Sequence, residues 1–457
     1  MQYAGEYILQ ECKLVSTSGI EFDLFELVAD IVIFESIHDH CVTGSISFKD
    51  STNITKIAPI IGEEKLKLKL ISPQEKPTDE TIINYTKNPL NIYKISSEER
   101  MNEKTLMPRL AFTSQEAYHN ATTRVSRSYS DTCSNIVTKI FRDEKYLRSK
   151  KKLTVEETIG LKRLVVPSMK PFKTIEMLSR QSNSKNHKSS PTYFFYETTK
   201  GFHYRSIDGL CSEDAVFAFQ ENIPDNLPDG TSKDPIGTLQ TIESYQILAP
   251  RDTIKNTTSG AFCSELIRHD LYSKTVDTSN YDYNAQFTKD THLDKFPIAS
   301  ASTDKYTNKT LFNHYNAKRF VQTTTMGFAH EDDAVTSKNY PYQDDNAPEV
   351  LQRRASRMRL LEDAITLNIT VPGNTSIQAG DVVELDIERN STLTDKEQDK
   401  IYSGKYLITA IRHNFNQTSD EPRHVINMTV VRDSVGQPYY NTSIEYENKG
   451  SSETIVL

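Results

Sequence analysis

The clearest alternation of apolar and polar residues lies between Ile365 and Ser434. The stretch contains four segments, ITLNITVPG, AGDVVELDIE, GKYLITAIRHNF and RHVINMTVVRDS. In the second segment aliphatic and acidic side chains alternate, in the order Val383, Glu384, Leu385, Asp386, Ile387 and Glu388. This two-residue period is typical of a strand with one buried and one solvent-exposed face. The Pro-Gly and Ser-Gly pairs between segments mark turns, so the stretch predicts an antiparallel β unit.

A degenerate copy of this pattern lies near the start of the chain. In GEEKLKLKLI leucines alternate with lysines, in the order Lys65, Leu66, Lys67, Leu68, Lys69 and Leu70. LNIYKISS and LMPRLAFTS follow about 26 and 40 residues after Leu66, and the matching C-terminal segments begin about 24 and 43 residues after Val383. The spacing is retained while the residue identities are not. Alternating strands are common, so coincidence stays open as the competing explanation, but the spacing favours an internal duplication.

Residues 1–115 are rich in strand patterns. They include the long apolar segment EFDLFELVADIVIFES and, after a short polar connection, the alternating VTGSISFKDS. Two strands joined by a tight connection predict a hairpin. With the segments at 64–71, 91–96 and 106–113, the region predicts five or six strands, which suffice for a sandwich or a small barrel.

Residues 116–205 have a mixed pattern. SDTCSNIVTKIFRDEKYL has apolar residues at helical spacing, with Ser130 or Asp131 as the expected N-cap. VPSMKPFKTIEMLSRQS places Pro171 at the first position of a second helix. TYFFYETTKGFHYRSI contains two aromatic strands around a Glu-Thr-Thr-Lys-Gly turn. The region predicts an α+β module of two helices and a hairpin.

Residues 206–275 return to strand patterns. TIESYQILAPRDTIKNTTSGAFCSELIRHDL repeats the order of DIVIFESIHDHCVTGSISFKDS, namely an apolar strand, a polar connection, a small-residue strand and an aspartate. We therefore assign residues 206–275 and 362–435 to a second β domain, split by an insertion at 276–361.

The insertion is polar and only weakly periodic over residues 276–349, which predicts little secondary structure of its own. Pro348 then opens a helix that is expected to turn Leu351, Ala355 and Met358 inward. Residues 436–457 carry no core pattern and predict a tail that frays or docks on a partner.

Composition narrows the function classes. The chain of 457 residues carries 54 Lys and Arg against 62 Asp and Glu, a net charge of −8, which argues against a broad basic face that grips nucleic acid, although not against nucleic acid passing nearby. No apolar run approaches the ~20 residues of a membrane span, and MQYAGEYILQEC lacks the features of a signal peptide. Five scattered cysteines without a C-x-x-C pair predict reduced thiols. These features predict assembly in a cytoplasm.

Three candidate sites for chemistry can be assembled from the sequence, and each has a simpler explanation. His38-Asp39-His40 could supply metal ligands, but the residues lie in an expected hairpin connection. His413 and His424 fall on neighbouring expected strands near Asp433, without a nucleophile motif to complete a triad. Glycine-rich phosphate loops are absent from the sequence. The sequence therefore predicts a non-enzymatic protein with no catalytic residue, metal or cofactor.

The densest charge cluster is basic and lies on the helix expected after Pro348. It consists of Arg353, Arg354, Arg357 and Arg359. Four guanidiniums could neutralise phosphates, but the acidic balance favours a helix face that meets solvent or an acidic surface of another subunit. The run from Arg148 to Lys152 is interpreted as a solvated loop.

The order of these segments resembles that of the baseplate hub proteins of contractile-tailed bacteriophages. The resemblance rests on the hairpin TYFFYETTKGFHYRSI, the interrupted second strand unit, and the succession NITVPGN, AGDVVELDI and SGKYLITAIRHNF; it extends to about residue 436. No single motif is diagnostic, so the order carries the likeness. It implies a mainly β fold with α+β parts: two tube-type antiparallel β-barrel domains plus smaller α+β insertion modules.

The resemblance also implies an assembly and a set of partners. Three chains are expected to form a pseudo-hexameric ring that joins a trimeric spike protein to tail-tube or tape-measure proteins, with baseplate wedge proteins outside. DNA is expected to pass through the channel without sequence-specific binding, and no membrane insertion is expected. The expected location is the virion tail baseplate, assembled in the host cytoplasm. The internal duplication then has a role, because two units in each of three chains give six positions.

Two alternatives stay open at this stage. One is the hub part of a contractile secretion-system spike, which the short remainder after the second β domain disfavours. The other is a tail-tip cell-wall hydrolase, which needs a pair of carboxylates across a cleft. Glu156 and Glu157 are adjacent and are expected to point to different faces.

The two copies differ in the charge of their outer faces. Lys65, Lys67 and Lys69 line one face, and Glu384, Asp386 and Glu388 line the other. We hypothesise that these faces, together with Arg353, Arg354 and Arg357, take part in subunit interfaces.

Overall fold

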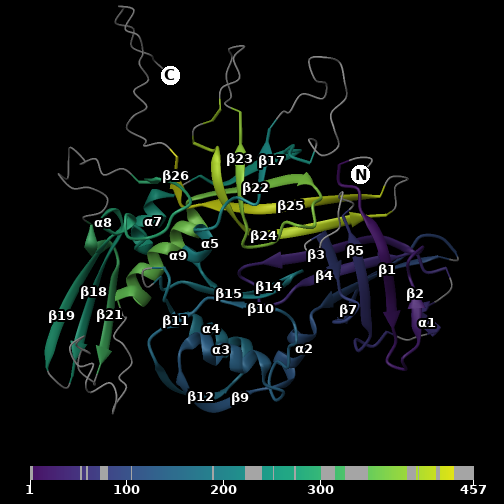
Figure 1. The fold of residues 1–457 in the computed structure, drawn as a ribbon, viewed down its shortest axis with the longest axis horizontal. Coiled ribbons are helices and arrows are strands. Elements are labelled where there is room, and N and C mark those ends of the chain that lie inside the picture. The colour runs from purple at the N-terminus through teal and green to yellow at the C-terminus, as the bar shows by residue number, and fades with distance from the viewer. Residues whose placement is uncertain are drawn as a thin grey trace, which may run out of the picture.

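The computed structural model describes residues 4–436 except 52–53, 58–59, 73–80, 104, 188–189, 222–238, 251, 272–273, 300–313, 325–347, 389–397, 400 and 418–421. Its largest element is a 14-stranded sheet, accompanied by five smaller sheets and several short helices (Figure 1). The prediction of a mainly β fold with α+β parts is confirmed.

The N-terminal part of the large sheet is called here the first β unit. It comprises β1 (Ile8–Val15), β2 (Glu21–Asp23), β3 (Val28–Ser36), β4 (Thr43–Phe48), β5 (Lys65–Ile71), β6 (Ile82–Asn84), β7 (Leu90–Arg100) and β8 (Leu106–Thr113), with the short helix α1 (Ile54–Ile57). The strand alternation predicted for Leu66, Leu68 and Leu70 is confirmed, because all three leucines are fully buried in one hydrophobic core.

The C-terminal part of the large sheet is called the second β unit. It comprises β16 (Phe217–Gln220), β17 (Ser244–Pro250), β22 (Ile365–Pro372), β23 (Val382–Asp386), β24 (Gly404–Asn416) and β25 (Arg423–Arg432). Val383, Leu385 and Ile387 lie in its separate core. Each β unit therefore has its own set of buried aliphatic side chains.

The two β units repeat one order of strands. In the first unit the neighbours run β3-β4-β8-β7-β5, and in the second they run β17-β22-β25-β24-β23. The three segments whose spacing predicted the duplication occupy equivalent places, since β5, β7 and β8 correspond to β23, β24 and β25. The repeat inferred from spacing is thus present in the strand pairing.

One predicted strand of the second β unit pairs elsewhere. The segment around Cys263–Asp270 forms a strand, β18, but it pairs with β19 (Thr275–Asp282) and β21 (Arg319–Thr324) in a sheet of their own, called here the side sheet. The partner of β17 is β22, which pairs with it in antiparallel register. A two-residue period predicts a strand and its buried face, but not which strand lies beside it.

The α+β module follows the first β unit. It comprises α2 (Gln115–Thr122), β9 (Val125–Asp131), α3 (Cys133–Arg142), β10 (Leu153–Val155), β11 (Thr158–Ile159), β12 (Lys162–Met169), α4 (Pro171–Ser179), β13 (Asn183–Ser184), β14 (Tyr193–Thr198), β15 (Gly201–Ser206) and α5 (Ile207–Cys211). The two predicted helices and the aromatic hairpin are confirmed. The cap of α3 is Thr132 rather than Ser130 or Asp131, since its side chain accepts a hydrogen bond from the Asn135 amide.

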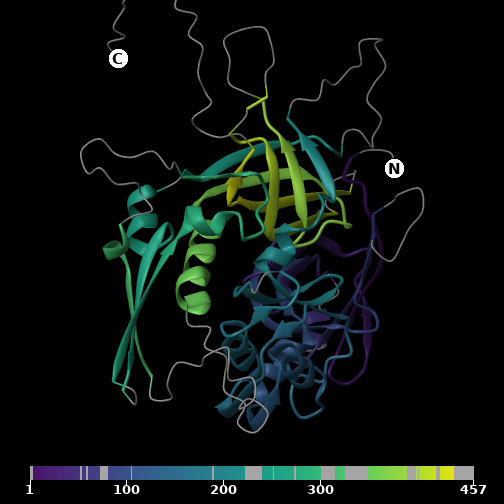
Figure 2. The ribbon, with the colours of Figure 1, turned by 60° about the vertical axis from the view of Figure 1, so that its left-hand side comes forward.

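The insertion contains more regular structure than predicted. Besides β19 and β21 of the side sheet it holds α8 (Tyr283–Phe287), β20 (Phe296–Pro297), η3 (Tyr315–Ala317), the π-helix η5 (Pro348–Arg353) and most of α9 (Arg354–Asp363). The helix α7 (Thr253–Ser259) and strand β18 come before residue 276, and β20 pairs with β26 (Ser434–Val435). Both views place the side sheet beyond α9, on the far side of the molecule from the first β unit (Figures 1 and 2). The predicted tail at 436–457 lies almost wholly outside the described residues.

Candidate functional site

The two β units are joined edge to edge into one sheet. Strand β24 changes its neighbour along its length: residues 404–407 pair with β23, whereas residues 410–416 pair with β3 of the first β unit. The pairing is antiparallel and runs from Ala410 opposite Ser36 to Asn416 opposite Asp30. We call this contact the internal junction. It is a ladder of backbone hydrogen bonds between two copies of the same architecture.

Side chains also cross the internal junction. Phe415 belongs to β24 but lies in the core of the first β unit, fully buried. Its ring centroid is 5.1 Å from that of Tyr7 and 4.0 Å from that of His424. The two β units therefore share apolar contacts as well as backbone bonds.

A buried carboxylate ties the α+β module to the same place. Glu35, at the end of β3, accepts hydrogen bonds from the backbone amides of Thr199 (2.6 Å) and Ala379 (3.1 Å). Thr199 lies in the turn between β14 and β15, and Ala379 precedes β23. Burial is the largest influence on this carboxyl and raises its pKa to about 7, despite the two amide donors.

This raised pKa predicts a pH-dependent stability. The folded chain holds the Glu35 proton up to about pH 7, whereas the unfolded chain releases it near its ordinary value of 4.5. Between these values the folded state binds more protons, so the free energy of unfolding should fall as pH rises, by about 3 kcal/mol from this group. Urea unfolding of wild type and Glu35→Gln at pH 5, 6 and 7 measures this. An equal pH slope in both proteins would rule out Glu35 as its source.

The part of the joined sheet formed by β22, β25 and β24 has a polar, partly exposed outward face. Across β22, β25 and β24 its side chains bond to one another: Asn427 donates to Thr370 (2.8 Å), Asn414 donates to Asn427 (2.8 Å), and Thr429 donates to Asn368 (2.8 Å). Since the strands are in register, these residues form a ladder of amides and hydroxyls along the sheet. We call it the Asn/Thr ladder.

Two arginines that border the Asn/Thr ladder contact groups of the same sheet. Arg109 forms an ion pair with Asp30 (3.0 Å). The guanidinium of Arg412 lies 5.6 Å from the ring centroid of Phe34, across the internal junction, and donates to Asn414. Both guanidiniums are thus engaged within the chain, although both arginines are exposed. The alternation of Asn and Thr in ITLNIT and INMTVV is the sequence signal that could have revealed this face.

The structure places the two predicted charged faces on equivalent strands. Lys67 and Lys69 of β5 correspond to Glu384 and Asp386 of β23 when the strands are aligned on Leu66 and Val383, which pair with the equivalent strands β7 and β24. Lys65 and Glu384 are exposed. Lys67 already forms an ion pair with Glu21 of β2, at 2.5 Å. Within one chain the two faces do not pair with each other among the described strands. Glu388, just beyond β23, is half-buried and bridges to Gln398.

The arginine cluster lies in a different environment from the one predicted. Arg357 is 1% exposed and lies 2.6 Å from both Asp208 and Asp433. Arg353 lies 2.5 Å from Asp290. These two guanidiniums thus face acids of their own chain rather than solvent, and we call the group the arginine network.

The inward face of the arginine helix also differs from the prediction. Gln352, Ser356, Leu360 and Leu361 are buried together with Arg357, whereas Leu351, Ala355 and Met358 are only partly buried. Ser356 donates to the backbone of Ala261 at 2.5 Å, and Gln352 donates to Ser264. Polar partners from the turn after α7 and from the side sheet therefore decide which helix face is buried. Arg354 is half-buried, and burial lowers its pKa.

The loop from Arg148 to Lys152 is not simply solvated. Lys151 lies between Glu116 (2.8 Å) and Glu197 (2.6 Å) with its side chain 10% exposed. Burial alone would lower the pKa of Lys151, but the two carboxylates hold it above the ordinary value. The interpretation as a solvated loop is wrong for this residue, because its acidic partners come from α2 and β14.

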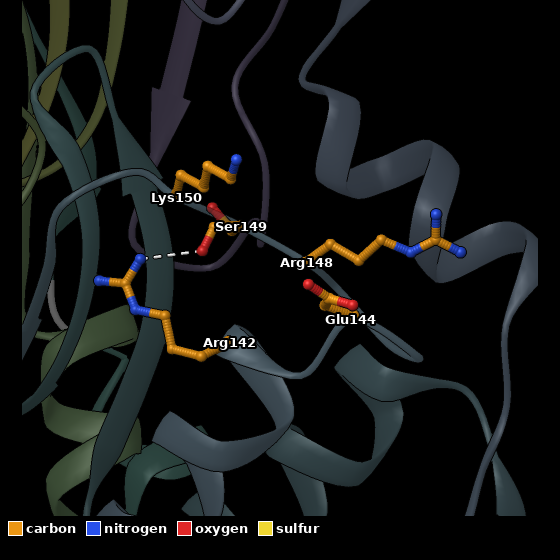
Figure 3. Close-up of a pocket in the computed structure, with 5 residues that line it drawn as sticks. All are labelled: Arg142, Glu144, Arg148, Ser149 and Lys150. Atoms are coloured by element: carbon orange, nitrogen blue, oxygen red, sulfur yellow. Dashed lines mark hydrogen bonds between the residues drawn. The ribbon is translucent and has the colours of Figure 1, made fainter.

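A surface recess lies beside this loop, lined by Arg142, Glu144, Arg148, Ser149 and Lys150. Figure 3 shows Arg142 turned toward Ser149, while Arg148 extends to the other side. Arg142 donates to the backbone carbonyls of Ser149 (2.9 Å) and Lys151 (2.8 Å). Its guanidinium therefore fastens the loop to the end of α3.

The histidines form no catalytic group with Asp433. His413 and His424 are buried with their nitrogens 3.1 Å apart. Burial lowers the pKa of His413 to about 3, and it also holds the pKa of His424 well below its ordinary value. Asp433 instead contacts His292, at 2.8 Å. His40 contacts the Phe195 carbonyl. In the described part of the chain no three His, Cys, Asp or Glu residues gather as a metal site, and no helix there is long and apolar enough to cross a membrane.

The fold is similar to that of solved structures of tail proteins. The 43 kDa tail protein of prophage MuSo2 from Shewanella oneidensis superimposes with a TM-score of 0.51 at 9% identity, covering 93% of this chain and 99% of that one. A tail protein from Neisseria meningitidis MC58 gives 0.51 at 11% identity, covering 94% and 98%. No protein-family model and no curated protein sequence matches the chain. At such identities the likeness shows a shared fold over nearly the whole of both chains.

Proposed function

We propose that this chain is a structural subunit of a phage tail baseplate hub. Three copies form a ring of six β units that joins a central spike to the tail tube and surrounds the DNA channel. The observation that carries the proposal is the duplication itself: two β units with one strand order, already joined edge to edge at the internal junction. The shared fold with two phage tail proteins supports it.

The duplication suits a subunit that must match two symmetries. A trimer of a duplicated chain offers three identical positions to a trimeric spike and six similar positions to a sixfold tube. The two units differ where partners would differ, as in the lysines of β5 and the acids of β23. Exact copies would present the same surface six times, whereas inexact copies keep the two sets of positions distinct.

The Asn/Thr ladder supports the placement of a channel. DNA that moves through a pore must not be retained by it, and phosphate contacts with Lys or Arg give most of the affinity of nonspecific binding. The ladder offers amides and hydroxyls that bond mainly to one another. We therefore assign this face to the lumen. A chain of net charge −8 fits the same role.

The remaining parts of the proposal concern partners and location. The spike is the partner at one end of the ring and tube or tape-measure proteins are the partners at the other, with wedge proteins outside and assembly in the host cytoplasm. The role is structural and non-enzymatic. Buried groups such as Arg357, Lys151 and His413 serve the fold, since their polar contacts lie within the chain.

Sedimentation equilibrium of the purified full chain over a wide concentration range tests the proposal. The expected species is three times the chain mass, reached without larger polymers. The same measurement with the spike protein of the same tail added should give a defined complex of three chains with three spike chains. A chain that stays monomeric at all concentrations, alone and with the spike, contradicts the proposal.

The charged outer faces give a further prediction about assembly. Replacing Lys65, Lys67 and Lys69 together by glutamate should weaken trimer formation several-fold at low salt, because acids would then stand on every unit of the ring. The difference should shrink at high salt, since exposed charges are screened. A matched reversal of Lys150, Lys173 and Lys289 serves as the control. Unchanged assembly of the β5 variant at low salt would show that these faces do not meet.

A further inference from the structure

Each β unit has one strand with an open edge, β7 in the first unit and β17 in the second. The equivalent strands of the other unit, β24 and β3, pair with each other at the internal junction. Strand β3 pairs with β4 on one side and with β24 on the other. Its counterpart β17 pairs only with β22 among the described strands. Strand β24 pairs with β25 along one side, and with β23 and then β3 along the other. Its counterpart β7 pairs with β8, and on the other side only Leu90 and Asn91 meet β5.

Core-facing side chains at these open edges are left uncovered. Ile33 of β3 is fully buried, whereas its counterpart Ile247 of β17 is 37% exposed. Ile411 of β24 is 2% exposed, whereas its counterpart Ile95 of β7 is 37% exposed. The isoleucines differ in exposure for one reason: β3 and β24 have a neighbouring strand that covers their side chains, whereas, in the described part of the chain, β17 and the second half of β7 do not. Two open edges with exposed isoleucines are features that soluble proteins rarely leave unprotected.

The counterparts can be aligned residue by residue through their partner strands, because one register shift repeats, whereas the second shift of β7, between Ile95 and Ser97, has no equivalent in β24. The register of β24 with β25 shifts between Ile408 and Ala410, and that of β7 with β8 shifts between Ile92 and Lys94. Following the pairing through β8 and β25 makes Glu99 the counterpart of Asn414. Following it through β4 and β22 makes Gln246 the counterpart of Val32. Asn414 and Val32 stand directly opposite each other at the internal junction.

We propose that β17 of one chain pairs antiparallel with the second half of β7 of the next chain, with Gln246 opposite Glu99. This contact would repeat the internal junction between chains and would cover Ile247 and Ile95 on the core side. The inference rests on the proposed trimer and specifies which edges close it. Three internal junctions and three such contacts then alternate around one continuous sheet.

The occupant of these edges is a second copy of this chain because the chain already contains the template for the contact. β17 stands at one end of the strand order, and the open half of β7 lies past six intervening strands and the internal junction; the two edges do not pair with each other within the described chain. A head-to-tail contact of this kind is heterologous, and it forms a ring when its rotation closes. The rotation that relates the first β unit to the second within one chain would also relate the second β unit to the first unit of the next chain. Every junction around the ring would then have the same geometry.

Engineered disulfides test the register. The full-length variant Glu99→Cys/Gln246→Cys places thiols on residues that should face each other between chains, at Cα separations of about 4.5–5.5 Å, within the range of a disulfide. Mild oxidation should then give covalent trimers as the main species in non-reducing gels. The control is Glu98→Cys/Gln246→Cys, in which a one-residue slip points the two thiols to opposite faces. It should give less than about a tenth of the cross-linked product. Both variants keep the native cysteines, four of which are buried.

Sedimentation of the same samples separates the outcomes. Covalent trimers with the first pair and few with the second support the inference. A trimer by mass with no cross-link overturns the inference and leaves the proposed function standing, whereas a monomer overturns both. Ile247→Lys provides a second test without cysteines: it should abolish the trimer, while Val276→Lys, a change of an exposed residue on β19, should not. A full trimer of Ile247→Lys would contradict the inference.

Discussion

Replacing Arg357 by methionine should lower the free energy of unfolding by about 3–5 kcal/mol, because the change leaves two buried carboxylates without their cation. Arg357 contacts both Asp208 and Asp433 at 2.6 Å, and no described helix residue with a charge is less exposed. Burial alone would raise the pKa of Asp433, but His292 and Arg357 hold it below its ordinary value. Removing the guanidinium removes that compensation. Urea unfolding followed by circular dichroism measures the loss.

Arg359→Met is the matched control for this prediction. Arg359 lies on the same helix with its side chain 43% exposed and contacts Glu362 at 3.4 Å. An exposed pair of this kind contributes little, so its loss should change the free energy of unfolding by less than about 1 kcal/mol. Equal effects of the two substitutions would contradict the assignment of Arg357 to a buried network.

Replacing Phe415 by alanine should lower the free energy of unfolding by about 3–5 kcal/mol, the usual cost of removing a buried aromatic ring. The ring comes from β24 of the second β unit but fills the core of the first, against Tyr7 and His424. Its loss should therefore also loosen the coupling between the units. Thermal unfolding by calorimetry should show one main transition in the wild type and a broader or divided one in the variant.

Phe34→Ala tests the same junction from its other face. Phe34 lies on β3, opposite Arg412 of β24, with its ring on the exposed side of the sheet. It loses an exposed cation–π contact rather than a core group, so the expected change is about 1 kcal/mol or less. If Phe34→Ala lowered the free energy of unfolding as much as Phe415→Ala does, the burial of Phe415 in the core would not explain its effect.

The sequence predicted the strands of the fold better than their partners. The alternation in KLKLKL and VVELDI identified β5 and β23, because a half-buried strand leaves a two-residue period. The same signal marked Cys263–Asp270 as a strand but could not show that it pairs within the side sheet. Strand partners depend on contacts between segments far apart in the chain, which a local period does not contain.

The environments of the charged residues depend even more on contacts between segments that are far apart in the sequence. Arg357 is buried because Asp208 and Asp433, far from it in the sequence, converge on it. Lys151 meets its acids from α2 and β14 in the same way. The Asn/Thr ladder could have been predicted from the sequence, since Asn and Thr alternate with aliphatic residues in β22 and β25. The open edges of β7 and β17 could not, because whether a strand has a neighbour depends on contacts that a local sequence pattern does not contain.

The proposed ring is tested most directly by an electron-microscopic reconstruction of the assembled chain, viewed along its symmetry axis. We expect three chains in a closed ring, with six β units in one continuous sheet whose Asn/Thr ladder lines the central opening. A particle in which the β units of neighbouring chains do not meet edge to edge, or in which the ladder faces outward, would contradict it.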